Sequence, residues 1–259
     1  MRKYIILLLV FLVFGSCDSD DSIPDHPIPD EYRDFTVIPD NIFEQALIDL
    51  GYDDVLDGVV VTSNITNIET LDVSGRGIKR LEGIRDFVNL KVLWCERNKL
   101  YKLEEISEIS GLKVLICNSN SLDSLNVAGN KNLTTLECDS NVIKWLIINE
   151  SIQSLSCHFN RIESLDISKS KQLERLTCSE NSIRHLDLSN NPELSLLYCQ
   201  GNRLLTLNLK NLNNSRIASF DSKRNPELAC IEVSDLAHAE TFWLNYIDSG
   251  SSFSENCGY

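Results

Sequence analysis

Leucine, cysteine and asparagine recur along this chain at fixed distances from one another, in a pattern that repeats about every 21 residues. The pattern LxxLxCxxN is clearest in LTTLECDSN, residues 133–141, where apolar and polar residues alternate. Alternation with a period of two predicts a short strand that has one face inward. We therefore expect Leu136 and Cys138 to point into a core, while Thr135 and Glu137 point outward.

Seven segments fit this pattern, and a divergent first copy, IETLDVSGR, covers residues 68–76. The others read LKVLWCERN, LKVLICNSN, IQSLSCHFN, LERLTCSEN, LSLLYCQGN and IASFDSKRN. Such a period, with leucines at positions 1 and 4 and asparagine at 9, is the signature of leucine-rich repeats. One repeat cannot bury its own apolar face, so the copies must stack. We expect a curved, right-handed leucine-rich repeat solenoid of about eight copies. A parallel sheet would line its concave face, with mostly extended or 3₁₀ segments on the return side.

Asparagine occupies position 9 of seven consecutive copies. These residues are Asn98, Asn120, Asn141, Asn160, Asn181, Asn202 and Asn225. We expect their side chains to turn inward, where each amide can bond backbone groups that the bend leaves unpaired. The recurrence therefore predicts a structural ladder rather than a catalytic role.

Cysteine occupies position 6 of six consecutive copies, with Val73 and Ser222 in its place at the two ends. The six are Cys95, Cys117, Cys138, Cys157, Cys178 and Cys199. Metal binding is disfavoured because a ladder spreads its ligands along a line. Disulfides between neighbours match the allowed Cα distance, but parallel side chains would distort the backbone to reach the required S–S dihedral angle. Free thiols that act as small buried hydrophobes are the favoured interpretation.

Cysteine at this position, in a repeat followed by LDxSxN, resembles the cysteine-ladder class of bacterial leucine-rich repeats. That class includes certain Listeria internalins and many surface proteins of Flavobacteria. The resemblance covers about residues 37–257, nearly the whole chain after its leader. It implies a curved solenoid that binds other macromolecules, and it does not name one.

The first residues resemble a bacterial export signal. Arg2 and Lys3 precede an apolar run over residues 4–14, which is shorter than the roughly 20 residues that a membrane-spanning helix needs. Gly-Ser-Cys17 follows, as in the lipobox of bacterial lipoproteins, although Phe14 replaces the smaller aliphatic residue more usual there. We expect a lipid anchor at Cys17, and an ordinary signal peptide is the alternative.

The segment after Cys17 is acidic and then rich in proline. Residues 18–22 resemble the signal that sends lipoproteins of Bacteroidetes to the outer face of the outer membrane, with a solvated linker as the alternative. The prolines that follow favour a semi-rigid tether. We expect a lipid-anchored outer-membrane protein that faces the cell surface. The predicted organisation is a leader over 1–17, a tether over 18–35, an N-terminal cap over 36–67, repeats over 68–229 and a C-terminal cap over 230–259.

Amphipathic segments flank the repeats and predict capping helices. The first segment ends at Gly51, and its apolar face would carry Phe43, Ala46, Leu47 and Leu50. The second would carry Leu236, Ala239, Trp243 and either Tyr246 or Ile247. Cys230 and Cys257 lie outside the ladder, and in an exported protein they predict a disulfide that closes this cap.

Charge and missing motifs narrow the function. The formal charge is −14, and without Arg2 and Lys3 the chain has 22 basic against 38 acidic residues, a net of −16. Such a field repels phosphate backbones, so we expect no nucleic-acid partner. The sequence has no nucleophile elbow, P-loop, zincin or dinucleotide motif, and its four histidines are scattered. We expect neither an enzyme, nor a metal site, nor a cofactor.

The outward residues at positions 3 and 5 of the copies are the candidate binding residues. An apolar cluster on two adjacent strands would consist of Val92, Trp94, Val114 and Ile116. Protein interfaces favour such outward apolar and aromatic residues. The alternative is that the N-terminal cap or the tether folds over them. The candidates further along are Glu137, Arg175, Leu196 and Tyr198, with Phe159 near them. We expect a recognition module for a protein or glycan partner. The alternative is a structural component of a cell-envelope complex.

Overall fold

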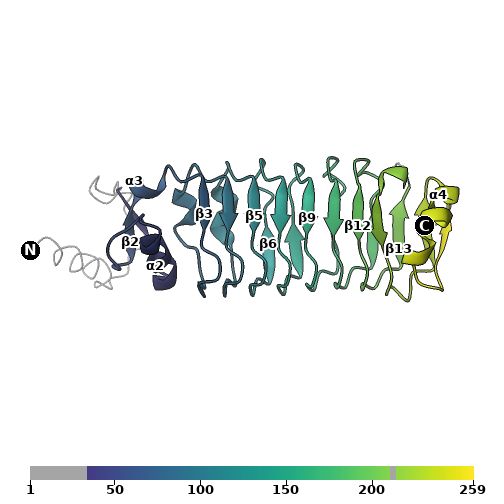
Figure 1. Cartoon of the computed structure of the whole chain (residues 1–259), viewed down its shortest axis with the longest axis horizontal. Helices are drawn as coiled ribbons and strands as arrows, with labels where there is room; N and C mark the ends of the chain where they lie inside the picture. Colours follow the sequence, from purple (N-terminus) through teal and green to yellow (C-terminus); the bar gives the residue numbers. More distant parts are fainter. Residues whose placement is uncertain (1–33, 211–213) are drawn as a thin grey trace, which may run out of the picture. The chain divides into compact units, whose positions relative to one another are not determined.

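The computed structural model describes residues 34–210 and 214–259, so the predicted leader, Cys17 and nearly all of the tether lie outside the described residues. The described chain forms a stack of coils, each of which adds one strand to a parallel sheet of eight strands (Figure 1). We call this sheet the main sheet. Its strands are β3 (Thr70–Asp72), β4 (Val92–Trp94), β5 (Val114–Ile116), β7 (Thr135–Glu137), β9 (Ser154–Ser156), β10 (Arg175–Thr177), β12 (Leu196–Tyr198) and β14 (Ser219–Asp221).

The recurring leucines and cysteines form the interior. Leu136 and Cys138 are fully buried, whereas Thr135 and Glu137 are only partly covered, so the sides of this strand alternate as predicted. Neighbouring strands pair in register, which places Leu136 beside the middle leucine of each adjacent strand. Each copy therefore covers the apolar face of the next, and the hydrophobic effect holds the stack together.

Each ladder asparagine joins its own coil to the preceding one. The Asn141 Nδ2 donates to the Cys138 carbonyl and to the Cys117 carbonyl, both at 3.1 Å, and its Oδ1 accepts from the Leu122 N–H at 3.0 Å. Ser140, just before it, has a φ of 55°, which makes the tight turn at the end of the strand. The other ladder asparagines repeat the bonds to the cysteine carbonyls of two coils, with Val73 and Ser222 in place of cysteine at the ends. These bonds satisfy backbone groups that burial would otherwise leave unpaired.

A second column of polar side chains was not predicted. It lies three residues before the first leucine of a copy and consists of Asn130, Asn149, Ser170 and Asn191, all buried. The Asn149 Nδ2 donates to the Asn130 carbonyl at 2.7 Å and to the Leu133 carbonyl at 3.1 Å. This column therefore ties the coils together at the opposite bend from the first ladder.

The secondary structure of the return side changes along the stack. Two early coils use 3₁₀ helices, η2 (Ile84–Asp86) and η3 (Glu104–Glu108). Later coils, except the one between β9 and β10, use short strands that pair into two further parallel sheets, a pairing that the expected extended segments had not included. One sheet contains β6 (Ser124–Asn126) and β8 (Trp145–Ile147). The other contains β11 (His185–Asp187), β13 (Thr206–Leu209), β15 (Cys230–Val233) and β16 (Ser252–Ser254).

The N-terminal cap is a helix, α2 (Asn41–Asp49), beside the antiparallel pair β1 (Phe35–Val37) and β2 (Val59–Val61) and the short helix α3 (Thr62–Ile65). One carboxylate attaches α2 to the stack: Asp40 accepts from the N–H groups of Ile42 and Phe43, and also from those of Lys79 and Arg80. The expectation that Leu50 completes the buried face was wrong. The helix ends at Asp49, which leaves Leu50 exposed.

At the other end, α4 (Leu236–Phe242) and η5 (Leu244–Tyr246) cover the last coil. Trp243 is buried against the Phe220 ring of β14, with ring centroids 4.8 Å apart. Of the two residues that helical spacing left open, Ile247 is buried and Tyr246 is exposed, because α4 has already ended at Phe242. A disulfide joins Cys230 to Cys257.

Candidate recognition surface

The outward face of the main sheet is open to solvent. None of the sixteen outward residues of its eight strands is buried, although the middle residue of every strand is. The helices α2 and α4 lie at the two ends of the stack and not over the sheet (Figure 1). The face is therefore available to a partner within the part of the chain that the structure describes.

An apolar quartet, consisting of Val92, Trp94, Val114 and Ile116, occupies the N-terminal part of this face. Val92 pairs with Val114 and Trp94 with Ile116 across β4 and β5, so the four side chains are neighbours. The Trp94 residue remains 37% exposed and the other three are partly covered. The described N-terminal cap therefore does not bury the tryptophan, and the predicted tether lies mostly outside the described residues.

A second region lies further along, at the edge where the strands end. There a hollow of about 400 Å³ has a lining drawn from four coils. Its lining residues are Ser156, His158, Phe159, Thr177, Ser179, Glu180, Tyr198, Gln200 and Arg224. We call it the Phe159 hollow. Of the candidates from the sequence, Tyr198 lines it, and so does Phe159, which the sequence placed near them. Glu137 lies on a neighbouring strand and accepts from Asn118, Arg175 is exposed on β10, and Leu196 is partly covered on β12.

A carboxylate from the preceding coil orients two side chains of the hollow. Asp139 accepts from the Ser156 hydroxyl at 2.7 and 2.8 Å, and its Oδ2 lies 3.2 Å from the His158 Nε2. Burial raises the pKa of Asp139, against the effect of the hydrogen bond from Ser156 and the charge of His158. The serine hydroxyl thus bonds the carboxylate directly. That differs from a nucleophilic triad, in which the histidine lies between the two.

Hydrogen bonds also hold the other polar groups of the hollow. The Ser156 Oγ and Thr177 Oγ1 are 2.6 Å apart, and the Ser179 hydroxyl donates to the Gln200 Oε1 at 2.7 Å. The Tyr198 hydroxyl lies 2.6 Å from the Ser219 Oγ. These contacts run from one coil to the next, so the lining is fixed before any partner arrives.

Phe159 is the unusual member of its column. The residue before each ladder asparagine has a φ between 52° and 68°, a left-handed region that favours glycine, asparagine or aspartate. Arg97, Ser119, Ser140, Glu180, Gly201 and Arg224 hold the other positions. Phe159 has a φ of 52° and is 54% exposed. Its ring packs against the His158 ring, with the ring centroids 4.9 Å apart. An exposed phenyl group in this conformation has no counterpart among them.

An ion pair forms the far wall of the hollow. Glu180 pairs with Arg224, which comes from two coils further along. The carboxylate lies over Gly201, where a Cβ would come within 2.6 Å of the Glu180 Oε1. Glycine at this position therefore leaves room for Glu180 to reach across the intervening coil.

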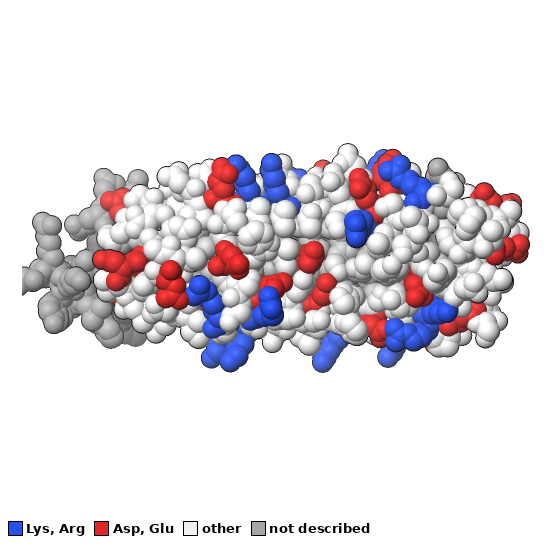
Figure 2. All heavy atoms as spheres, viewed as in Figure 1, with Lys and Arg blue, Asp and Glu red and all other residues white. Residues whose placement is uncertain are grey.

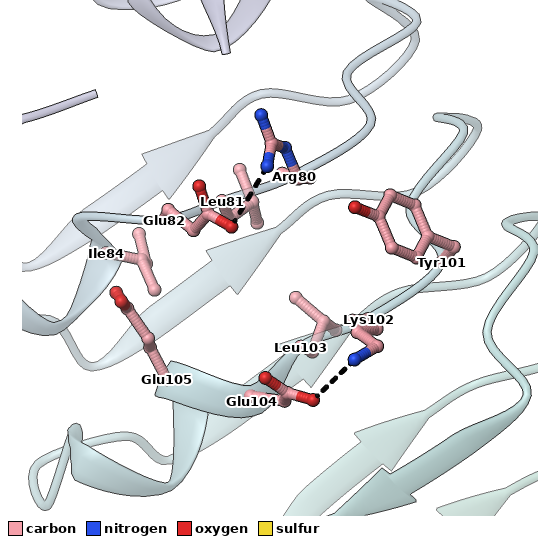
Figure 3. A pocket seen from close by; sticks show the side chains of 9 residues that line it. All are labelled: Arg80, Leu81, Glu82, Ile84, Tyr101, Lys102, Leu103, Glu104 and Glu105. Atoms are coloured by element: carbon pink, nitrogen blue, oxygen red, sulfur yellow. Dashed lines mark hydrogen bonds and ion pairs between the residues drawn. The ribbon is translucent and has the colours of Figure 1, made fainter. Parts of the chain in front are cut away.

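The return side has hollows of a different kind. Figure 3 shows one of about 230 Å³, in which Arg80 pairs with Glu82 at 3.4 Å and Lys102 with Glu104 at 3.0 Å. Glu105 also accepts from the Gly83 N–H. These charges are thus used in contacts within the protein. The adjoining hollow, of about 250 Å³, is bordered by Trp145 and Ile147, which are 66% and 52% exposed.

The six ladder cysteines are buried free thiols. Burial raises the pKa of Cys178 to about 12 and that of Cys117 well above its ordinary value. Several thiols face a carbonyl of the next coil, as Cys138 Sγ faces the Ser156 oxygen at 3.5 Å. Because the thiolate is the reactive form, these cysteines should be inert while the protein is folded.

The described residues contain no cluster of His, Cys, Asp and Glu that could hold a metal ion, and none of their helices is long and apolar enough to cross a membrane. Acidic and basic side chains are interspersed on the side of the molecule that Figure 2 shows. The net negative charge is thus not concentrated in one area of that side.

Comparison with known proteins gives structural matches only, since no family model and no curated protein matches the sequence. The functional domain of InlJ from Listeria monocytogenes, which includes a cysteine ladder, is 24% identical with a TM-score of 0.53. The match covers 77% of this chain and 52% of that one, so the chain spans about half its length. Internalin C2 from the same species is 18% identical with a TM-score of 0.63, and the match covers 84% of this chain and 95% of the other. A leucine-rich repeat protein of Leptospira interrogans is 22% identical with a TM-score of 0.51, over 67% and 45%.

The fold is a leucine-rich repeat solenoid. At these identities the likeness shows the fold alone, and it confirms the fold class that the repeat pattern predicts. The structure adds residues that sequence reasoning missed, chiefly Glu180, Gln200 and Arg224 in the hollow and Trp145 on the return side. A Trp-Leu-Ile run outside the repeat template was the available signal for Trp145, because alternation places its first and third residues outward.

Proposed function

We propose that this protein is a non-enzymatic recognition module that binds a protein partner through the exposed face of its main sheet. The apolar quartet is the observation that supports this most directly. Two valines, an isoleucine and a tryptophan lie together at outward positions, although polar residues would be less costly to hydrate there. Large, partly exposed aromatic side chains surrounded by smaller apolar ones are typical centres of protein interfaces.

The Trp94→Ala variant tests this function. Proximity labelling on intact cells would first identify the partner, and binding of the purified proteins would then be measured. We expect Trp94→Ala to weaken binding by roughly 2 kcal/mol or more, with little change in melting temperature, because the side chain points away from the core. Normal binding by a variant that melts much earlier would mean that Trp94 serves the fold.

One observation favours a second candidate function, that of a structural component of a cell-envelope complex which uses its return side. Trp145 and Ile147 are more exposed than Trp94 and border a hollow floored by Leu103 and Leu125. The Trp145→Ala variant belongs in the same binding experiment. Loss of the partner in Trp145→Ala, with Trp94→Ala unaffected, would assign the interaction to the return side.

We also propose that the module is attached by a lipid at Cys17 and displayed on the outer surface of the outer membrane. The basic start, the apolar run and the Gly-Ser-Cys17 sequence support attachment, and the acidic residues 18–22 support display. In Cys17→Ala we expect the protein to leave the membrane fraction or to remain unprocessed. Membrane association that persists without a lipid, as judged by mass spectrometry, would contradict this.

A further inference from the structure

We propose that the Phe159 hollow is a carbohydrate-binding site that takes a neutral sugar unit of a glycan. This site is separate from the apolar quartet, which lies on other strands. Its volume of about 400 Å³ falls within the range of small-ligand sites. Three properties of its lining support this assignment: an aromatic platform, a mixed set of hydrogen-bonding groups, and paired charges.

The platform is the Phe159 ring. A pyranose has a face of C–H groups with partial positive charge, which packs on the negative face of an aromatic ring. Phe159 is 54% exposed at the margin of the hollow, and the His158 ring supports it at 4.9 Å. Its left-handed backbone and its exposure both make phenylalanine an unfavourable choice for the fold. A ligand that covers the ring accounts for a residue that the scaffold itself does not require.

The polar lining matches hydroxyl groups, which donate and accept at the same time. Ser156, Thr177 and Ser179 contribute hydroxyls, while Gln200 contributes an amide. The Gln200 Oε1 accepts from Ser179. Because the amide is planar, its two N–H groups then point away from Ser179. Contacts between coils hold these groups in place, and a prearranged site loses less entropy on binding.

The charges disfavour an anionic ligand. Arg224 already pairs with Glu180, and His158 with the Asp139 carboxylate. A phosphate or carboxylate would therefore meet the Glu180 carboxylate in the lining, while the two basic side chains of the hollow, His158 and Arg224, already have acidic partners. The paired groups can still bond neutral hydroxyls, since each carboxylate has several acceptor sites and the guanidinium has five N–H donors.

A protein side chain is the competing occupant. An apolar one would displace water from the hydrogen-bonding sites that the contacts within the lining leave unused, and would offer no hydrogen bond in its place, which makes binding less favourable. A sugar replaces those lost hydrogen bonds while it covers the phenyl ring. The chemistry of the lining thus favours the sugar over an apolar side chain.

The Phe159→Gly variant tests the proposal on the full-length mature protein. Glycine suits the left-handed backbone and already holds the equivalent position at Gly201, so the melting temperature should be unchanged or higher. The probes are hexasaccharides of glucose, mannose, galactose and N-acetylglucosamine, in α and β linkages, measured by calorimetry. We expect the parent protein to bind at least one of them and Phe159→Gly to lose tenfold or more in affinity.

Three control variants define the outcome. Phe159→Trp should retain binding because it keeps an aromatic face, and Ser119→Gly, in the same column outside the hollow, should bind like the parent. Trp94→Ala should also bind the sugar normally, which separates this site from the proposed protein-binding function. The proposal is wrong if the parent protein binds none of the hexasaccharides, or if Phe159→Gly binds as the parent does. It is also wrong if Phe159→Gly weakens only the binding of a protein partner.

Discussion

The apolar quartet and the Phe159 hollow lie on one sheet and differ in almost every outward residue. The quartet is aliphatic and aromatic, and its side chains lie beside one another across β4 and β5. The hollow is lined mostly by hydroxyl, amide and charged groups that bond from coil to coil. Beneath both regions the inward residues are the same types, with Leu93 and Cys95 under the first and Leu176 and Cys178 under the second.

This difference shows how the fold separates stability from recognition. An inward residue contacts its equivalents in the coils on both sides, so the stack constrains its size and polarity. An outward residue of the same strand has solvent above it, and its replacement opens no cavity in the core. Neighbouring residues in a strand thus have different constraints, and the two regions could diverge while the scaffold stayed the same.

The largest expected effect tests whether the core contributes equally to stability under the quartet and under the hollow. Leu93→Ala, under the quartet, and Leu176→Ala, under the hollow, should each lower the free energy of unfolding by roughly 2–5 kcal/mol. Both side chains are fully buried in the same type of environment, so each truncation leaves a cavity. Chemical denaturation of the two variants gives the comparison.

Trp94→Ala and Phe159→Gly are the matched outward controls and should lose far less. A large loss in only one of the two leucine variants would mean that the coils do not share one uniform core. A loss in an outward variant as large as in its inward neighbour would overturn the separation of roles between the two sides of a strand.

Most of the scaffold could be predicted from the sequence because stacking demands repetition. The inward direction of Leu136 and Cys138 followed from alternation alone, and the bonds of Asn141 followed from the need to satisfy a bent backbone. The second polar column was missed because Ser170 interrupts its asparagines, and because Asn130 and Asn149 lie outside the nine-residue template. The exposure of Leu50 was not predicted because helical spacing does not fix where a helix ends.

The Phe159 hollow could not be predicted from the repeat pattern. Its far wall depends on Arg224 reaching Glu180, 44 residues earlier in the chain, across a coil that has glycine at the crossing point. No property of a single repeat indicates such a contact. The sequence did direct attention to Tyr198 and Phe159, because aromatic residues at outward positions are visible in an alignment of the copies.

A smaller effect is expected for the cysteine ladder, which also runs under both regions. Cys95→Ser and Cys178→Ser should each cost roughly 1–3 kcal/mol, because each places a hydroxyl in an apolar column. In the native protein all six ladder thiols should resist a thiol reagent until unfolding, while Cys230 and Cys257 remain joined. Mass spectrometry after labelling gives both results. A disulfide between two ladder cysteines in a peptide map would contradict the prediction.

The pH dependence of stability provides the finest test of these buried thiols. In the unfolded chain a thiol ionises near its ordinary pKa of 9.0, whereas burial raises the pKa of Cys178 to about 12 in the folded protein. Between these values the unfolded state releases a proton that the folded state retains, so stability is full below pH 9 and falls as the pH rises. One such thiol lowers the free energy of unfolding by about 1.4 kcal/mol for each pH unit in this range.

The Cys178→Ala variant should therefore lose stability less steeply between pH 9 and pH 11 than the parent protein. Cys95→Ala should do the same, because burial raises the pKa of the Cys95 thiol as well. Equal slopes in the parent and both variants would mean that the ladder thiols are accessible to solvent.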